Sequence, residues 1–365
     1  VPRNPGAWLM GTAKHRAIDQ LRRRERLERK VEVLGRQQET DEEAAPSEFD
    51  AALEDDIDDD LLRLMFTACH PVLSTDARVA LTLRMLGGLK TEEIARAFLV
   101  PEATLAQRIV RAKRTLADAD VPFEVPKGPE RAERLASVLE VIYLVFNEGY
   151  SATAGDDWMR PALCEDALRL GRVLAELMPG EAVVHGLVAL MEIQASRSRA
   201  RTGPNGEPIL LLDQDRGRWN HVLIRRGLAA LARAIELGGS LGPYGLQAAI
   251  AACHARARTP GETDWARIAA LYEELGEVNP SPIVELNRAV ALSMAVGPGP
   301  ALELVDELTA DPSLEGYHLL PSVRGDLLVR LGRLEEARGE FERAASLTRN
   351  ARERTLLLER AAACG

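Results

Sequence analysis

The sequence predicts an all-α protein, and three observations support this fold class. Ala, Leu, Arg and Glu, which favour helices, are abundant, whereas aromatic residues make up only 4% of the chain. Apolar residues recur at three- and four-residue spacing in long segments such as 167–178, 225–237 and 266–278. The 365 residues are enough for two or three domains with substantial cores.

Composition limits the function classes that fit the chain. A net charge of −10 argues against a protein that coats nucleic acid over its whole surface, so any DNA contact must be local. The four cysteines lie far apart without paired spacing, which indicates reduced cytoplasmic thiols. No stretch approaches the roughly 20 apolar residues of a membrane span, and no signal peptide is visible. We therefore expect a cytoplasmic protein without membrane partners.

Charge and proline divide the chain into five segments. Residues 1–30 hold nine Lys or Arg against three acids, whereas residues 39–60 hold twelve acids and no base. Such an acidic run repels itself and has little to bury, which indicates a linker. Three prolines within ten residues indicate a second linker further on. The predicted segments are a basic helix at 1–31, an acidic linker at 32–56, a compact helical domain at 57–120, a Pro-rich linker at 121–130 and a helical domain at 131–365.

A short basic helix is predicted over residues 101–117. Pro101 suits its first turn, where the missing N–H is tolerated. Apolar residues spaced by four, three and four form one stripe that would face a core: Leu105, Ile109, Ala112 and Leu116. The preceding helix is predicted to start at Thr91, a good N-cap residue, with acids in its first turn.

The opposite face of this helix carries Gln107, Val110, Arg111 and Arg114, with Thr104 and Arg108 on its flank. Arg can bond both acceptors of guanine, Gln can bond adenine, and a small apolar side chain can touch a thymine methyl group. The two helices together therefore predict a helix-turn-helix. The alternative is an ordinary helical pair whose basic face is solvated.

Residues 92–116, "EEIARAFLVPEATLAQRIVRAKRTL", resemble region 4 of bacterial sigma factors of the extracytoplasmic-function group. The shared pattern falls on Glu93-Ile94-Ala95, Thr104-Leu105, Arg108 and Arg111-Ala112. Residues 4–24, "NPGAWLMGTAKHRAIDQLRRR", are similar to the end of sigma region 2. The order also agrees, because the acidic connector of 32–56 lies between the two regions.

This resemblance implies a sigma factor that directs core RNA polymerase to promoter DNA. It implies base contacts near −35 from Gln107, Arg108 and Arg111, with Thr104 beside them and phosphate contacts from Lys113 and Arg114. Near −10 it implies phosphate contacts from Arg22, Arg23 and Arg26, and a base or backbone contact from His15.

Two departures from the family pattern alter these expectations. Leu99 stands where the turn usually holds Gly, and a left-handed Leu costs roughly 1 kcal/mol or more, so we expect a turn of different construction. Most of region 2 should precede Val1, so this chain is expected to bind core polymerase poorly.

The C-terminal part resembles the tetratricopeptide repeat. Residues 325–347 place Gly325, Gly332, Ala337, Phe341, Ala344 and Leu347 in that pattern, and Ala289 and Ala301 precede Gly325 and Ala337 by 36 residues. Together with "VFNEGYSA" at 145–152, this resembles the sigma-factor subgroup with a C-terminal tetratricopeptide-like domain, which implies regulation of the sigma regions by that domain. The alternative is a plain helical bundle.

Polar residues gather between two helices of this domain at Glu148, Tyr150, Asp156, Asp157, Trp158 and Asp166. They indicate a recognition loop that binds a ligand or docks region 4. The alternative is a long connector in which Asp156 or Asp157 caps the next helix.

An enzyme is the main rival class. No two of the six His share a ligand-like spacing with an acid, and the segments "GPNGEP" and "GPGP" lack the Lys-Ser/Thr of a phosphate-binding loop. We therefore expect no catalytic residues, no metal site and no cofactor. The remaining alternative is a DNA-binding regulator that acts without polymerase and carries a helical-repeat interaction domain.

Overall fold

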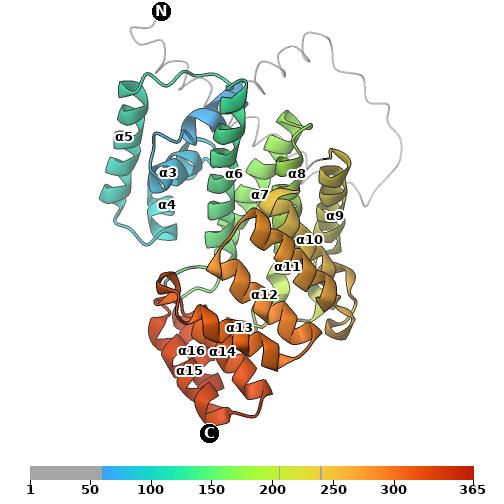
Figure 1. The fold of residues 1–365 in the computed structure, drawn as a ribbon. Coiled ribbons are helices and arrows are strands. Elements are labelled where there is room, and N and C mark those ends of the chain that lie inside the picture. The colour runs from blue at the N-terminus through green and yellow to red at the C-terminus, as the bar shows by residue number, and fades with distance from the viewer. Residues whose placement is uncertain (1–59, 205, 239–240) are drawn as a thin grey trace, which may run out of the picture. The chain divides into compact units, whose positions relative to one another are not determined.

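The computed structural model describes residues 60–204, 206–238 and 241–365, and every regular element in these ranges is a helix (Figure 1). The predicted all-α class is therefore confirmed. Contacts divide the chain into two compact units, Val1–Leu144 and Val145–Gly365. Among the described helices, none is long and apolar enough to cross a membrane. The predictions for the acidic linker and for His15, Arg22, Arg23 and Arg26 lie outside the described residues.

The N-terminal unit packs short helices around one core. Its elements are a helix over residues 60–68, α3 (Thr75–Met85), α4 (Thr91–Ala97), α5 (Glu102–Asp118) and the first part of α6 (Pro129–Tyr150). The largest fully buried side chains include Phe66, Leu81, Leu83, Ile94 and Leu105, which come from four of these helices. Their burial holds α4 and α5 in place over α3.

The first part of α6 belongs to this core. Arg134 is 5% exposed and donates to the carbonyl of Phe66 at 3.0 Å. Ser137 donates to the carbonyl of Cys69, and Arg78 on α3 bonds both Ser137 and Glu140. The division between the units accordingly falls within α6, after the Pro-rich segment of 121–130.

Helix α4 differs from the expectations at both of its ends, in its N-cap and in the turn that leads to α5. Lys90, one residue before Thr91, is the N-cap of α4, and its backbone N–H donates to the Glu93 carboxylate at 2.6 Å. Leu99 itself is left-handed, with φ 53°. The Leu99 and Val100 N–H groups donate to the carbonyls of Arg96 and Ala95, which is the Schellman pattern of a helix end. The turn therefore has the usual construction, with Leu where Gly is common.

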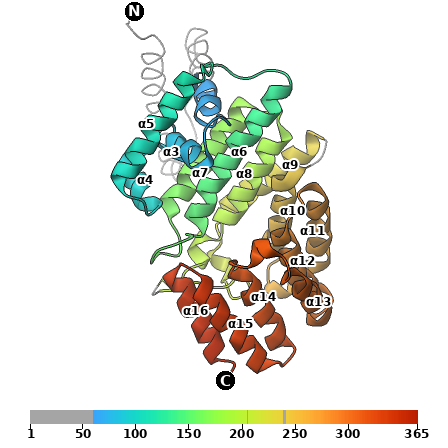
Figure 2. The same cartoon turned by 60° about the vertical axis from the view of Figure 1, so that its left-hand side comes forward.

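The C-terminal unit is a succession of helices (Figure 2). Most of them pack against the next helix in sequence, but α10 packs mainly on α8 and only slightly on α9. Short 3₁₀ turns connect several of them. The helices are α7 (Pro161–Leu177), α8 (Ala182–Ala195), α9 (His221–Glu236), α10 (Gly242–Arg256), α11 (Trp265–Val278), α12 (Pro282–Ala295), α13 (Pro298–Leu308), α14 (Leu319–Arg330), α15 (Leu334–Leu347) and α16 (Ala351–Ala362).

The small residues of 325–347 lie where α14 and α15 approach closely. A Cβ added to Gly325 would stand 2.7 Å from the Phe341 ring, so no larger residue fits without movement. Ala337 and Ala344 are fully buried beside Phe341. Gly332 forms the turn with φ 76°. These positions are those the repeat pattern requires, and the assignment to the tetratricopeptide family stays a prediction.

Candidate nucleic-acid interface

Helix α5 buries one stripe and exposes the rest of its surface. Its buried residues are Leu105, Ile109, Ala112 and Leu116, as the spacing predicted. The helix begins at Glu102, with Pro101 as its N-cap. Because the stripe packs α5 against α3 and α4, the side of the helix on which each remaining residue lies is fixed.

Four of the predicted site residues meet in one groove. Thr104, Gln107, Arg108 and Arg111 line a hollow of about 340 Å³ between α5 and the segment before and within α3. The opposite wall, which sequence reasoning missed, consists of Val72, Leu73, Ser74 and Ala77. Thr104, Gln107 and Arg111 are exposed, so this face of α5 is accessible to solvent.

Arg108 already has a partner in the free protein. Its guanidinium lies 3.2 Å from the carboxylate of Asp76, in the first turn of α3. The Arg108 side chain is 29% exposed and that of Asp76 is 70% exposed. A base contact from Arg108 would therefore require the guanidinium to leave or share this carboxylate. No sequence pattern around Asp76 indicated the pair, because 32 residues separate its members.

The two predicted phosphate contacts lie apart from each other. Arg114 is exposed and lies on the same side of α5 as Gln107. Its guanidinium is 3.5 Å from the Asp118 carboxylate. Lys113 is also exposed. It lies two residues after Arg111, which places it about 160° from Arg111 around the helix axis. Lys113 therefore occupies the flank of α5 opposite the groove.

The turn that builds the far wall of the groove depends on a neutral His70. The Val72 N–H donates to His70 Nδ1 at 3.1 Å, which requires that nitrogen to be unprotonated. Burial, and then the charge of Arg134, lower the pKa of His70. His70 is therefore neutral at pH 7 and can accept this hydrogen bond.

The polar segment of the C-terminal unit does not cap α7. The N-cap of α7 is Arg160, and Asp156 and Asp157 are exposed ahead of it, which excludes the capping role. Glu148 is buried and pairs with Arg160, while Asp166 pairs with Arg169 on α7. In the described ranges, no three His, Cys, Asp or Glu side chains are grouped to hold a metal ion.

Comparison with known families identifies the domain that contains α5. Residues 63–116 match sigma-70 region 4, a stretch that holds α3, α4 and α5 up to its last buried residue. Residues 134–235 match a family of unknown function (DUF6596), which begins within α6. "Uncharacterized protein R00370" of Rhizobium meliloti (strain 1021) is 46% identical over 354 residues, covering 96% of this chain and 82% of that protein. The chain therefore belongs to the same family as this rhizobial protein and carries a sigma-70 region 4 domain, with a sigma-factor-like DNA-binding role in transcription.

Proposed function

We propose that the protein is a sigma factor that brings core RNA polymerase to promoters and initiates transcription, with region 4 reading the −35 element. One observation carries this proposal. The stripe of α5 is buried in the region 4 core while Gln107 and Arg111 are exposed over an open groove. A helix anchored on one side and polar on the other is the form that enters a major groove.

The residues of α5 divide by role. Gln107, Arg108 and Arg111 contact base edges, because they share the groove face and can make bidentate bonds. Thr104 lies at the end of this row and supports the same face. Arg114 and Lys113, which lie outside the groove wall, contact phosphates and set register.

The C-terminal helical domain regulates the sigma regions in this proposal, as in the subgroup with a tetratricopeptide-like extension. Its support is the close α14–α15 crossing at Gly325 and the succession of packed helix pairs, which in repeat proteins form a binding surface for another protein. We also propose a cytoplasmic location, where polymerase and promoter DNA are found.

Promoter-binding measurements can separate the roles of Arg111 and Arg114. We expect Arg111→Ala to lose about 1–3 kcal/mol of discrimination at one base position. Arg114→Ala should weaken binding to all sequences alike and lower the salt slope by about one unit. The measurement is fluorescence anisotropy with a series of single-base duplex variants at several salt concentrations. Arg343→Ala, an exposed change on α15, serves as control. Identical sequence profiles for the two α5 variants would refute the assignment.

Polymerase retention tests the sigma-factor function itself. The chain is passed over immobilised core RNA polymerase, once alone and once with a complete sigma region 2 joined ahead of Val1. We expect the joined form to be retained and to direct transcription from a matched promoter. If neither form is retained while promoter binding persists, the chain is a DNA-binding regulator that acts without polymerase.

A further inference from the structure

Helix α9 carries a local excess of positive charge. Residues 216–235, which end one residue before the last residue of α9, hold five Arg and no acid in a chain with a net charge of −10. Side chains of like charge repel one another, so such a run faces water or a counter-charge. The surface that these arginines form is therefore a candidate for binding a polyanion.

The packing of α9 on α8 fixes which of its residues face outward. Helix α9 packs mainly on α8 and only slightly on α10 (Figure 1). At Gly227 the two helices approach so closely that an added Cβ would stand 2.5 Å from the Ile193 side chain. The buried residues of α9 form one stripe at three- and four-residue spacing: Ile224, Gly227, Leu231 and Ala234. The residues on the opposite side of the helix are exposed.

Three arginines lie on this exposed side of α9. Arg225, Arg226 and Arg233 fall within about 100° around the helix axis, and they span about 12 Å along it. Arg233 lies 3.6 Å from the Glu236 carboxylate, whereas Arg225 and Arg226 form no ion pair with a described residue. The exposed residue between them is Ala229, whose small side chain lets another surface approach all three guanidinium groups.

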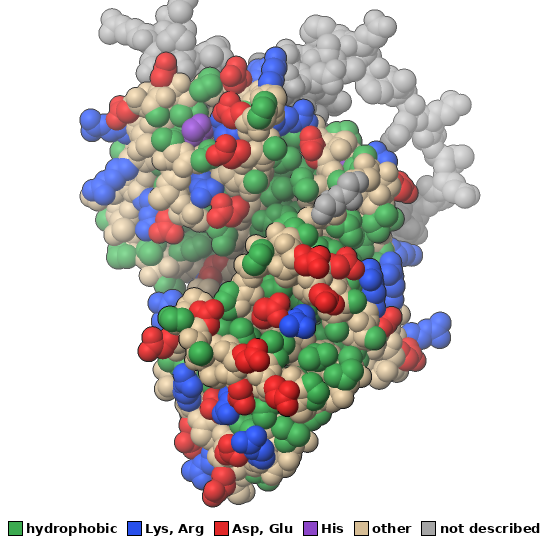
Figure 3. All heavy atoms as spheres, viewed as in Figure 1, with side chains coloured by type: hydrophobic (Ala, Val, Ile, Leu, Met, Phe, Trp, Pro, Cys, Tyr) green, Lys and Arg blue, Asp and Glu red, His purple; other side chains and the backbone are tan. Residues whose placement is uncertain are grey.

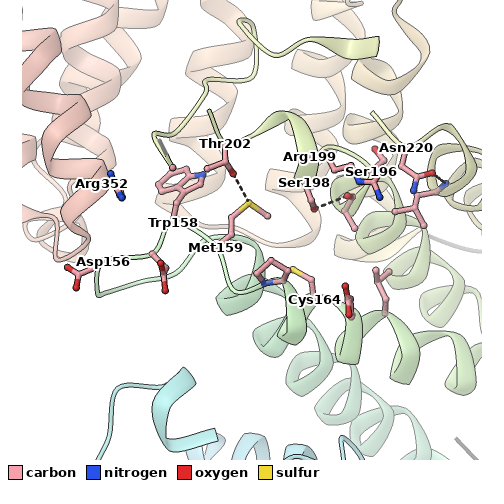
Figure 4. Close-up of a pocket in the computed structure, with 17 residues that line it drawn as sticks. Asp156, Trp158, Met159, Cys164, Ser196, Ser198, Arg199, Thr202, Asn220 and Arg352 are labelled. Carbon is pink, nitrogen blue, oxygen red and sulfur yellow. Dashed lines mark hydrogen bonds between the residues drawn. The ribbon is translucent and has the colours of Figure 1, made fainter. Parts of the chain in front are cut away.

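The basic surface continues beyond the N-terminal end of α9. Asn220 is the N-cap residue of α9, and its N–H donates to the Ser196 carbonyl at 2.8 Å. Asn220 and Arg199 line the same pocket (Figure 4). Arg199 is exposed, as is Arg218 two residues before the N-cap, and neither forms an ion pair with a described residue. Two further arginines therefore lie near the first turn of α9.

We propose that the exposed side of α9, with Arg225, Arg226 and Arg233, binds the phosphate backbone of duplex DNA. A duplex carries one negative charge for about every 1.7 Å of its axis, so several phosphates face the roughly 12 Å that the three arginines span. Each guanidinium group can donate two parallel hydrogen bonds to one phosphate. These contacts contribute affinity and carry no sequence information.

Two observations favour a duplex over other polyanions. Helix α9 contains no Phe, Tyr or Trp, so its exposed side offers no ring on which an unpaired base could stack. The chain also carries a sigma-70 region 4 domain, so DNA is the polyanion that it binds elsewhere. The inference rests on the proposed promoter function for the identity of the duplex, and it adds contacts from a part of the chain outside region 4.

Salt-dependent DNA binding by the full chain tests these contacts. We expect Arg226→Gln to weaken binding to a promoter duplex and to an unrelated duplex of equal length alike, by up to about fivefold, and to lower the salt slope by about 0.9. The double variant Arg225→Gln/Arg226→Gln should lower the slope by about twice that amount. Fluorescence anisotropy at several salt concentrations measures both quantities. Arg343→Gln/Arg349→Gln, at exposed positions on α15 and just after it, removes the same charge and is the matched control.

Arginine labelling of the native chain locates the contact directly. Phenylglyoxal reacts with accessible arginines, and mass spectrometry identifies each modified residue. We expect a bound duplex to protect Arg225 and Arg226 and to leave Arg343 reactive. Because labelling uses the native chain, its result does not depend on the folding of a variant.

The proposal is overturned if the double α9 variant keeps the affinity and salt slope of the Arg343→Gln/Arg349→Gln control, or if a duplex leaves Arg225 and Arg226 reactive. It is also overturned if the double variant loses binding to poly-L-glutamate but keeps its binding to DNA, which would assign the surface to an acidic protein. A failure of the promoter function gives a different result, because the native chain would then bind the promoter and the unrelated duplex with equal affinity.

Discussion

Leu99 is held in a backbone conformation that side chains other than Gly rarely adopt. The Schellman hydrogen bonds at the end of α4 require a left-handed residue at this position, and Leu99 adopts φ 53° with its side chain 56% exposed. Little packing compensates for the strain at an exposed side chain. The turn that sets the angle between α4 and α5 is therefore formed at a cost in stability.

We expect Leu99→Gly to raise the free energy of unfolding by about 1 kcal/mol, because Gly removes the left-handed strain. The measurement is urea denaturation combined with hydrogen exchange of the α4 and α5 amides. Ala106→Gly, at an exposed helical position of α5, is the control and should lower stability by about 1 kcal/mol. A destabilised Leu99→Gly protein would show that packing by the Leu side chain outweighs the strain.

The Asp76–Arg108 pair lowers the positive potential of the groove. We expect Asp76→Asn to tighten promoter binding a few-fold and to leave the salt slope nearly unchanged, because Arg108 is then free for its base-edge contact and adds no phosphate contact. Anisotropy titrations at several salt concentrations measure both effects. Glu133→Gln removes one exposed negative charge from α6 and controls for net charge. Weaker binding in Asp76→Asn would instead show that Asp76 orients Arg108 for its DNA contact.

At the scale of elements, α6 completes the region 4 core. Arg134 and Ser137 satisfy carbonyl groups in the last turn of the 60–68 helix and just after it, and Arg78 on α3 binds Glu140 on α6. A buried carbonyl without its donor is costly, so these contacts cannot be lost without penalty. The region 4 match ends at residue 116, yet the structural unit extends through the first part of α6.

We expect Arg134→Ala to lower the stability of the N-terminal unit by about 2–4 kcal/mol. The substitution removes the hydrogen-bond donor of the Phe66 carbonyl and leaves a cavity where the buried side chain was. Hydrogen exchange of the α3 and α5 amides in the full chain measures the loss. Arg96→Ala, an exposed change on α4, should stay within about 0.5 kcal/mol. Equal effects of the two substitutions would contradict a structural role for α6 in this unit.

At the scale of the whole molecule, an acidic protein exposes a local basic helix. The chain has a net charge of −10, and the C-terminal unit shows acidic side chains interspersed with basic and apolar ones on the face in Figure 3. The basic side chains of α5 therefore provide a local site for phosphate in a molecule whose net charge repels it. This arrangement favours one docking orientation over non-specific coating.

The stability of the C-terminal unit should depend on pH through His254. Burial, and then the charges of Arg197 and Arg216, lower the pKa of His254 to about 4. An unfolded His titrates near 6.5, so the unfolded state binds the proton first and stability falls as pH decreases from 6.5 towards 4.

We expect the unfolding free energy of the native chain to fall between pH 7 and pH 5, with His254 accounting for about 2 kcal/mol of the loss. In His254→Gln that part of the pH dependence should be absent. Urea denaturation at both pH values measures it, and the variant's own value at pH 7 corrects for changed packing. An unchanged pH dependence in the variant would exclude His254 as the source.

Several features of the fold could be predicted from the sequence, because they depend on residues close to one another along the chain. The buried stripe of α5, the place of the helix-turn-helix and the close crossing at Gly325 all follow from side-chain spacing along a helix, which depends on neighbours a few residues away. The left-handed Leu99 was visible as a departure from the family pattern, although its conformation was not.

Only the tertiary structure decided the features that join distant residues. Three such features depend on where helices lie relative to one another. They are the Asp76–Arg108 pair, the packing of the first part of α6 in the region 4 core and the hydrogen bond from Asn350 to Ala152. Helix periodicity says which side of a helix is buried, but it does not say which partner buries it.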